Sequence, residues 1–119
     1  SDLKPEKSEK KDEEETEEEE SATGPILQLE PIIVALPDDN NTFLRVELVM
    51  IAKKESELNI EETKLNLTND ISAFIRTLTL SQISGPSGYL HFREDLLDRA
   101  RLTTEGAIKE VLIMSMVAE

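Results

Sequence analysis

The sequence predicts an α+β domain in which a small antiparallel sheet packs two helices on one of its faces. Three observations predict this class. Apolar residues alternate with period two through Phe43–Ala52, as in a strand with one buried face. Apolar residues recur at helical spacing from Leu67 to Leu78 and again from Leu90 to Ala100. The closing run Ala107–Val117 favours a last strand, so the expected order is strand, strand, helix, helix, strand.

The first strand is expected over Ile26–Leu36, with an interruption at Pro31. Because proline donates no ladder hydrogen bond, this strand should lie at an edge or contain a bulge. The polar segment Pro37–Asn41 has the residues of a turn, so the two strands should form an antiparallel hairpin. One face of the second strand is wholly apolar and should meet the core: Leu44, Val46, Leu48, Met50 and Ala52.

The first helix should begin somewhere between Ile60 and Leu67. Gly85–Gly88 predicts a break, with Ser87 or Gly88 capping the next helix. The apolar stripe of that second helix is expected at Leu90, Leu97 and Ala100, widened by Phe92 and Leu96.

The N-terminal part of the chain is strongly acidic. Residues 1–23 carry eleven acidic residues against four lysines, and the whole chain has a net charge of −13. Such a segment has too little apolar surface to offset the ordering of its backbone. We therefore expect a disordered acidic linker over residues 1–24 and one domain over residues 25–119. Neither part is basic, which argues against nucleic acid and anionic lipid surfaces as partners.

The residue types argue against catalysis. The chain has one histidine, His91, and no cysteine, which excludes Cys–His pairs and metal sites with several histidines. No serine is indicated as a partner of His91, which we expect to be exposed in the first turn of a helix. Phosphate-binding glycine loops are also missing from the sequence. We predict no catalytic, cofactor-binding or metal-binding residues.

An interaction surface is the stronger expectation. If helices cover one face of the sheet, the other face should be polar, but here it carries apolar residues. The candidate self-association or partner face comprises Phe43, Val49, Ile51, Val111 and Ile113. The alternative is that loops or the Ile26 strand cover these residues, and the sequence leaves both open.

Several segments, taken in order and with their spacing, are similar to the flagellar basal-body-associated protein FliL family. The resemblance covers Ile26–Glu119. It is carried by Ile33–Leu36, Phe43–Leu48, Asn69–Ile75, Leu80–Gly85, a helix with Arg93, Leu96 and Leu97, and Ala107–Ile113.

The resemblance implies a stomatin (SPFH)-like domain in the periplasm, anchored in the bacterial inner membrane by one helix upstream of Ser1. It implies a non-enzymatic motor protein of motility and chemotaxis that forms homo-oligomeric rings. Its implied partner is the periplasmic part of the stator's peptidoglycan-binding subunit. Two alternatives remain: a stomatin-like membrane-anchored scaffold unrelated to flagella, and a small extracytoplasmic solute-binding or enzymatic domain.

Overall fold

The computed structural model describes residues 23–37 and 42–119. Most of the predicted acidic linker, residues 1–22, and most of the predicted Pro37–Asn41 turn lie outside the described residues. The elements, in chain order, are β1 (Thr23–Gln28), β2 (Ile32–Ala35), β3 (Phe43–Lys53), α2 (Ile60–Ile75), α3 (Leu80–Ile83), α4 (Gly85–Thr103) and β4 (Ile108–Ala118). The class is α+β, as predicted.

The sheet is built around β3. β4 runs antiparallel to β3 along one side, while β1 and β2 follow one another along the other side, also antiparallel. Ile26 lies opposite Ile51 and Ile33 lies opposite Arg45, which confirms the predicted hairpin. Pro31 falls in the gap between β1 and β2, at an edge of the sheet. The predicted single strand is therefore two strands, because proline interrupts the ladder.

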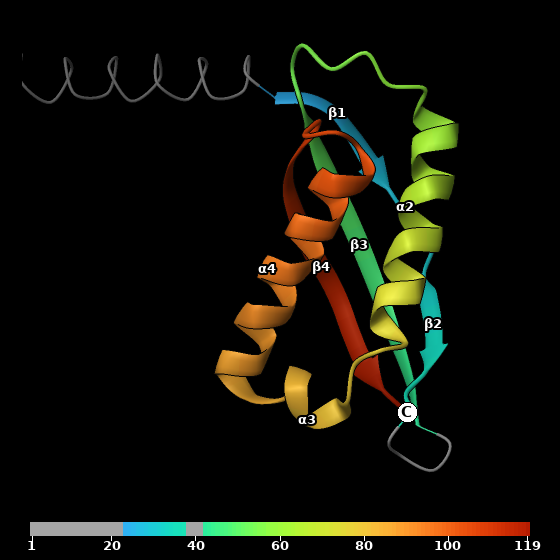
Figure 1. The fold of residues 1–119 in the computed structure, drawn as a ribbon, viewed down its shortest axis with the longest axis vertical. Coiled ribbons are helices and arrows are strands. Elements are labelled where there is room, and N and C mark those ends of the chain that lie inside the picture. Colours follow the sequence, from blue (N-terminus) through green and yellow to red (C-terminus); the bar gives the residue numbers. More distant parts are fainter. Residues whose placement is uncertain (1–22, 38–41) are drawn as a thin grey trace, which may run out of the picture.

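Both long helices lie on the same face of the sheet, as the sequence predicted (Figure 1). The predicted apolar face of β3 turns toward them, and each of its five residues is at most 1% exposed. Leu67, Ile71 and Ile75 of α2 are fully buried in the same core, where α2 packs over β1 and β2. The core is thus one apolar layer between the sheet and the helix pair.

The starts of the helices follow from local hydrogen bonds. α2 begins at Ile60 because the Asn59 side chain accepts a hydrogen bond from the backbone N–H of Glu62. The short helix α3, which the sequence pattern did not predict, has a capping box formed by Thr79 and Gln82.

The predicted start of the second long helix was wrong. α4 begins at Gly85, with Ser84 as its N-cap residue, so Ser87 and Gly88 lie inside its first turn. Gly85 has a positive φ of 76°, which lets the chain reverse after α3, and Pro86 fits the first turn of a helix. The same segment that signals a break therefore also starts the helix.

The buried stripe of α4 is also shifted from the prediction. Phe92, Leu96 and Ala100 are buried at i, i+4 and i+8, whereas Leu90 is 53% exposed. Leu97 is half-buried at the side of the stripe. Phe92 and Leu96, which were expected only to widen the stripe, are therefore at its centre.

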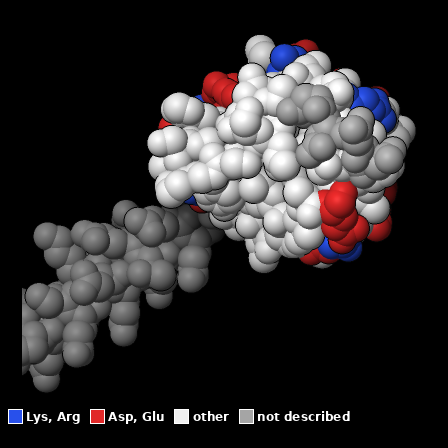
Figure 2. Space-filling model, turned by 90° about the horizontal axis from the view of Figure 1, so that it is seen from below, with Lys and Arg blue, Asp and Glu red and all other residues white. Residues whose placement is uncertain are grey.

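The end of the domain that contains α3 has few charged residues. Thr23 lies beside Lys53 at one end of the sheet, and α3 with the end of β4 lies at the other (Figure 1). The chain from Thr77 to Leu90 has no charged residue, and neither does Val111–Ala118. Seen from this α3 end, most of the visible surface is uncharged and charged side chains lie near its margin (Figure 2).

Candidate interaction surface

The face of the sheet turned away from the helices, called here the outer face, is made by alternate residues of each strand. On β3 these are Phe43, Arg45, Glu47, Val49 and Ile51, all exposed or half-exposed. Cross-strand neighbours share a face, so the register identifies the rest of the surface. Ile26 stands beside Ile51, Leu112 beside Val49, and both Ile33 and Val117 beside Arg45.

Large apolar side chains are exposed across this face. The exposed fraction is 64% for Ile26, 60% for Ile33, 46% for Phe43 and 42% for Val117. Isolated exposed apolar residues are ordinary, but neighbouring ones on a sheet face mark an interaction site. No described element covers them, since α2, α3 and α4 lie on the other side (Figure 1).

Two of the five residues predicted for this surface were wrongly placed. Val111 is 1% exposed and lies opposite Met50, and Ile113 lies opposite Leu48, so both belong to the core side. The cause is a bulge: Ser115 pairs with Glu47 and Ile113 pairs with Leu48, so Met114 has no partner on β3. One extra residue reverses which side chains face outward. Met114 is 62% exposed.

Phe43, Val49 and Ile51 do lie on the outer face, as predicted. The sequence reasoning missed the apolar residues contributed by the neighbouring strands, which are Ile26, Ile33, Leu112, Met114 and Val117. The hairpin register holds the signal for Ile26 and Ile33, because each lies opposite an outward-facing residue of β3. The outward-facing residues of β4 could be identified only once the bulge at Met114 was known.

A charged pair divides the apolar surface. An Arg45 side-chain nitrogen lies 2.9 Å from a Glu47 carboxylate oxygen, and both side chains are more than a third exposed. This pair sits between the apolar group around Ile51 and the one around Phe43. An exposed ion pair of this kind contributes little stability, so its effect is to set a polar band across the face.

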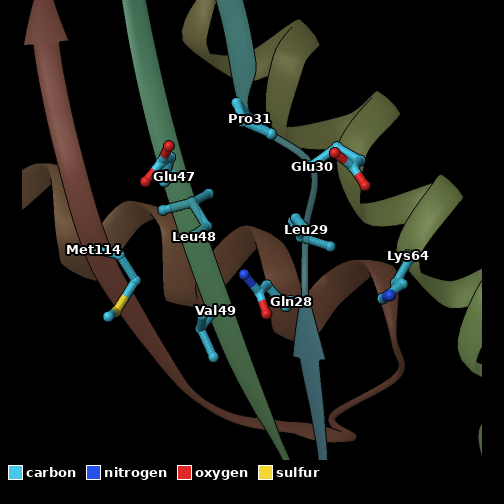
Figure 3. A pocket seen from close by; sticks show the side chains of 9 residues that line it. All are labelled: Gln28, Leu29, Glu30, Pro31, Glu47, Leu48, Val49, Lys64 and Met114. Carbon is cyan, nitrogen blue, oxygen red and sulfur yellow. The ribbon is translucent and has the colours of Figure 1, made fainter.

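A hollow of about 620 Å³ opens where the edge is interrupted between β1 and β2 (Figure 3). Its lining comes from the sheet and from Lys64 of α2: Gln28, Leu29, Glu30, Pro31, Glu47, Leu48, Val49, Lys64 and Met114. The gap at Pro31 leaves Glu47 and Leu48 of β3 without a ladder partner on the β1–β2 side, although the Leu29 N–H donates to the Leu48 carbonyl at 3.1 Å. The hollow therefore continues the outer face toward the sheet edge.

The described residues do not assemble a metal-binding cluster. No cluster of three or more His, Cys, Asp or Glu side chains within residues 23–37 and 42–119 has the arrangement to hold a metal ion. His91 is exposed, as predicted, although it lies in the second turn of α4 rather than the first. No helix in the described part of the chain has the length and apolar character needed to cross a membrane.

Comparison with known proteins gives one family. A search among curated proteins returned no match. The model of the flagellar basal body-associated protein FliL family matches residues 26–118, which is most of the chain and includes every described strand and helix except the start of β1. This chain belongs to the flagellar basal body-associated FliL family.

Proposed function

We propose that this chain is a non-enzymatic part of the flagellar motor that associates with the stator complex and supports its assembly, stability or activity in motility. Family membership supports a role at the flagellar basal body. The observation that carries the proposal furthest is the uncovered outer face, which exposes Ile26, Ile33 and Phe43 together. A surface of this kind suits protein association rather than chemistry on a small molecule.

In this role the domain has a stomatin-like fold and lies in the periplasm, anchored by a single inner-membrane helix upstream of Ser1. The partner is the periplasmic part of the peptidoglycan-binding stator subunit. The domain forms a homo-oligomeric ring when membrane tethering raises its effective concentration. The acidic segment 1–24 serves as the spacer between membrane and domain.

Co-purification in cells tests the association. Full-length protein with Ile51→Glu should lose the stator subunit and impair swimming, because the substitution puts a charge in the apolar group formed by Ile51 and its neighbour Ile26. Leu65→Glu is the matched control, since Leu65 is 60% exposed on α2 and lies away from the outer face. If the Ile51 variant keeps both the stator subunit and normal swimming, the outer face is not the contact. Normal motility of a deletion strain, with no stator association, would refute the function itself.

The spacer role has its own test. Deleting Asp12–Glu20 should impair swimming while the purified protein keeps its unfolding temperature, because the deleted residues precede the predicted domain, residues 25–119. Replacing the same residues with an uncharged segment of equal length separates the effect of length from that of charge. Normal swimming after the deletion would contradict the role.

A further inference from the structure

The two edges of the sheet are built differently. The edge formed by β1 and β2 is short, interrupted, and contains Pro25 and Pro31, which cannot donate to an added strand. The edge formed by β4 is eleven residues long, contains no proline, and has no charged residue from Val111 to Ala118. Within the described residues β4 pairs only with β3. One edge is thus protected against strand addition. The other is interrupted by register shifts at Lys109 and Met114, and the stretch from Ser115 to Ala118 pairs with β3 without a further shift.

The backbone at the end of β4 has groups free to accept a strand. Phe43 and Glu119 exchange two backbone hydrogen bonds of 2.8 Å, so they form a hydrogen-bonded pair. In an antiparallel ladder the next residue along, Ala118, then directs its N–H and C=O away from β3, and Met116 does the same. These groups point to the open edge of the sheet.

A pocket lies next to this edge, where α3 turns into α4. It is lined by Leu44, Leu80, Ile83, Ser84, Gly85, Tyr89, Met116 and Ala118. In Figure 1 the first half of α4 lies beyond β4, farther from the centre of the sheet than β4 itself. Near the start of β4, a guanidinium nitrogen of Arg93 in α4 lies 3.6 Å from a carboxylate oxygen of Glu110. The helix therefore overhangs the edge, and a strand added to β4 would lie beneath it.

The surroundings determine what can fit there. The pocket lining has no charged residue, and the overhanging corner belongs to the uncharged segment 77–90. A charged side chain entering it would lose water without gaining a partner. The acidic segment 1–22 of this chain, with its net negative charge, is therefore a poor occupant.

A second copy also fits poorly. Pairing β4 with another β4 would bring two overhanging α4 helices over one strand junction. Packed helix axes need about 8–10 Å, whereas neighbouring strands are about 4.8 Å apart. The β1 and β2 edge of a second copy is interrupted and carries the two prolines.

We propose that the free edge of β4, under the α3–α4 corner, binds an extended uncharged segment of another protein by strand addition. The added strand pairs with the backbone at Met116 and Ala118 and places an apolar side chain in the pocket beside Tyr89. This mode of recognition takes affinity from backbone hydrogen bonds and selectivity from the pocket. It does not depend on the flagellar role, since purified protein alone tests it.

The probe is a short, end-capped peptide of alternating valine and threonine, added at about 1 mM to the whole chain. Amide hydrogen exchange at Met116 and Ala118 should slow by about tenfold. Ala118→Pro should abolish the slowing at Met116, because it removes an outward donor without breaking the ladder to β3. Leu80→Glu should weaken binding through the pocket, while the exposed α2 variant Leu65→Glu should not. A peptide with lysine in place of each valine should not bind.

Three outcomes would overturn the proposal. In the first, exchange at Met116 and Ala118 is the same with and without the valine–threonine peptide. In the second, the Ala118→Pro variant, shown to be folded by circular dichroism, binds the peptide as the parent does. In the third, protection rises with protein concentration alone, which would make a second copy the occupant.

Discussion

The hydroxyl of Thr103 in α4 donates a hydrogen bond of 2.7 Å to a carboxylate oxygen of Asp70 in α2. Nearby, the guanidinium carbon of Arg99 lies 5.0 Å from the centre of the Phe74 ring, again joining α4 to α2. These contacts act at the exposed seam of the helix pair, above the buried stripes. They fix how the two helices sit side by side on the sheet.

The Thr103–Asp70 hydrogen bond should contribute to stability as a pair. A double-mutant cycle of Thr103→Val and Asp70→Ala, followed by urea unfolding, should give a coupling energy of about 0.5–1 kcal/mol, because the bond is exposed to solvent. Thr77→Val is the control, since the Thr77 hydroxyl, in the turn after α2, donates locally to the Phe74 carbonyl and does not reach α4. Additive single effects in the cycle would show that the bond across the helices contributes nothing.

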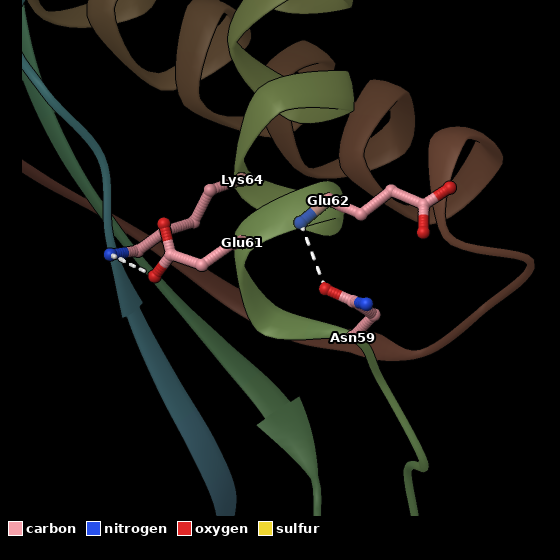
Figure 4. A network of polar contacts seen from close by, with 4 residues as sticks. All are labelled: Asn59, Glu61, Glu62 and Lys64. Carbon is pink, nitrogen blue, oxygen red and sulfur yellow. Dashed lines mark hydrogen bonds and ion pairs between the residues drawn. The ribbon is translucent and has the colours of Figure 1, made fainter.

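The cap of α2 should be worth more than the nearby ion pair. Asn59 accepts the Glu62 backbone N–H at 3.1 Å, whereas Lys64 and Glu61 lie 3.9 Å apart on the surface (Figure 4). Asn59→Ala should lower the free energy of unfolding by about 1 kcal/mol. Lys64→Ala should change it by less than about 0.5 kcal/mol. Equal losses in thermal unfolding would contradict this order.

Strand periodicity predicted the centre of this fold well. The inward-facing residues of β3 follow from an apolar repeat of two residues and from pairing in a hairpin. The observed register agrees with both. The pattern could not predict the bulge at Met114, because the residues on both sides of it are apolar and their sequence does not mark where the register shifts. The shift reverses the direction of Val111 and Ile113. The placement on the outer face was therefore correct for Phe43, Val49 and Ile51 and wrong for Val111 and Ile113.

The α3–α4 corner was beyond sequence periodicity for a different reason. α3 has four residues, which is too short for a helical repeat, and its capping box is its main signature. Gly85 and Pro86 favour a break and a helix start equally. On α4, exposed Leu90 and buried Leu96 have the same side chain, so only the packing against the sheet distinguishes them.

The inward direction of Val111 on β4 can be tested by comparison with Ile51, which faces outward on β3. Val111→Glu should unfold the domain, with a loss of about 3–5 kcal/mol, because it buries an unpaired charge at a position that is 1% exposed. Ile51→Glu should cost less, about 1–2 kcal/mol, because its half-exposed side chain faces outward, even though the new carboxylate would lie opposite Glu110. Circular dichroism against temperature measures both. A folded Val111→Glu protein would show that the bulge is misplaced.

The shifted stripe of α4 gives a second comparison with identical side chains. Leu96→Ala removes a fully buried side chain and should cost about 2–5 kcal/mol. Leu90→Ala changes a residue that is 53% exposed and should cost less than about 1 kcal/mol. Urea unfolding of the two variants under the same conditions measures the difference. The reverse order would restore the stripe expected from the sequence.

Replacing Gly88 with alanine should lower the stability of the domain, which is the opposite of the usual effect in a helix. Replacing a glycine inside a helix with alanine normally stabilises it by about 0.5–1 kcal/mol. Here a Cβ at Gly88 would meet the backbone oxygen of Gln82 at 2.8 Å and the backbone carbon of Ile83 at 2.9 Å. Because backbone atoms cannot move aside as a side chain can, Gly88→Ala should destabilise the domain by about 1–3 kcal/mol. Ser87→Ala, an exposed neighbour in the same turn, should stay within about 0.5 kcal/mol of the parent. A stabilised Gly88→Ala protein in urea unfolding would mean that α3 does not pack closely against the first turn of α4.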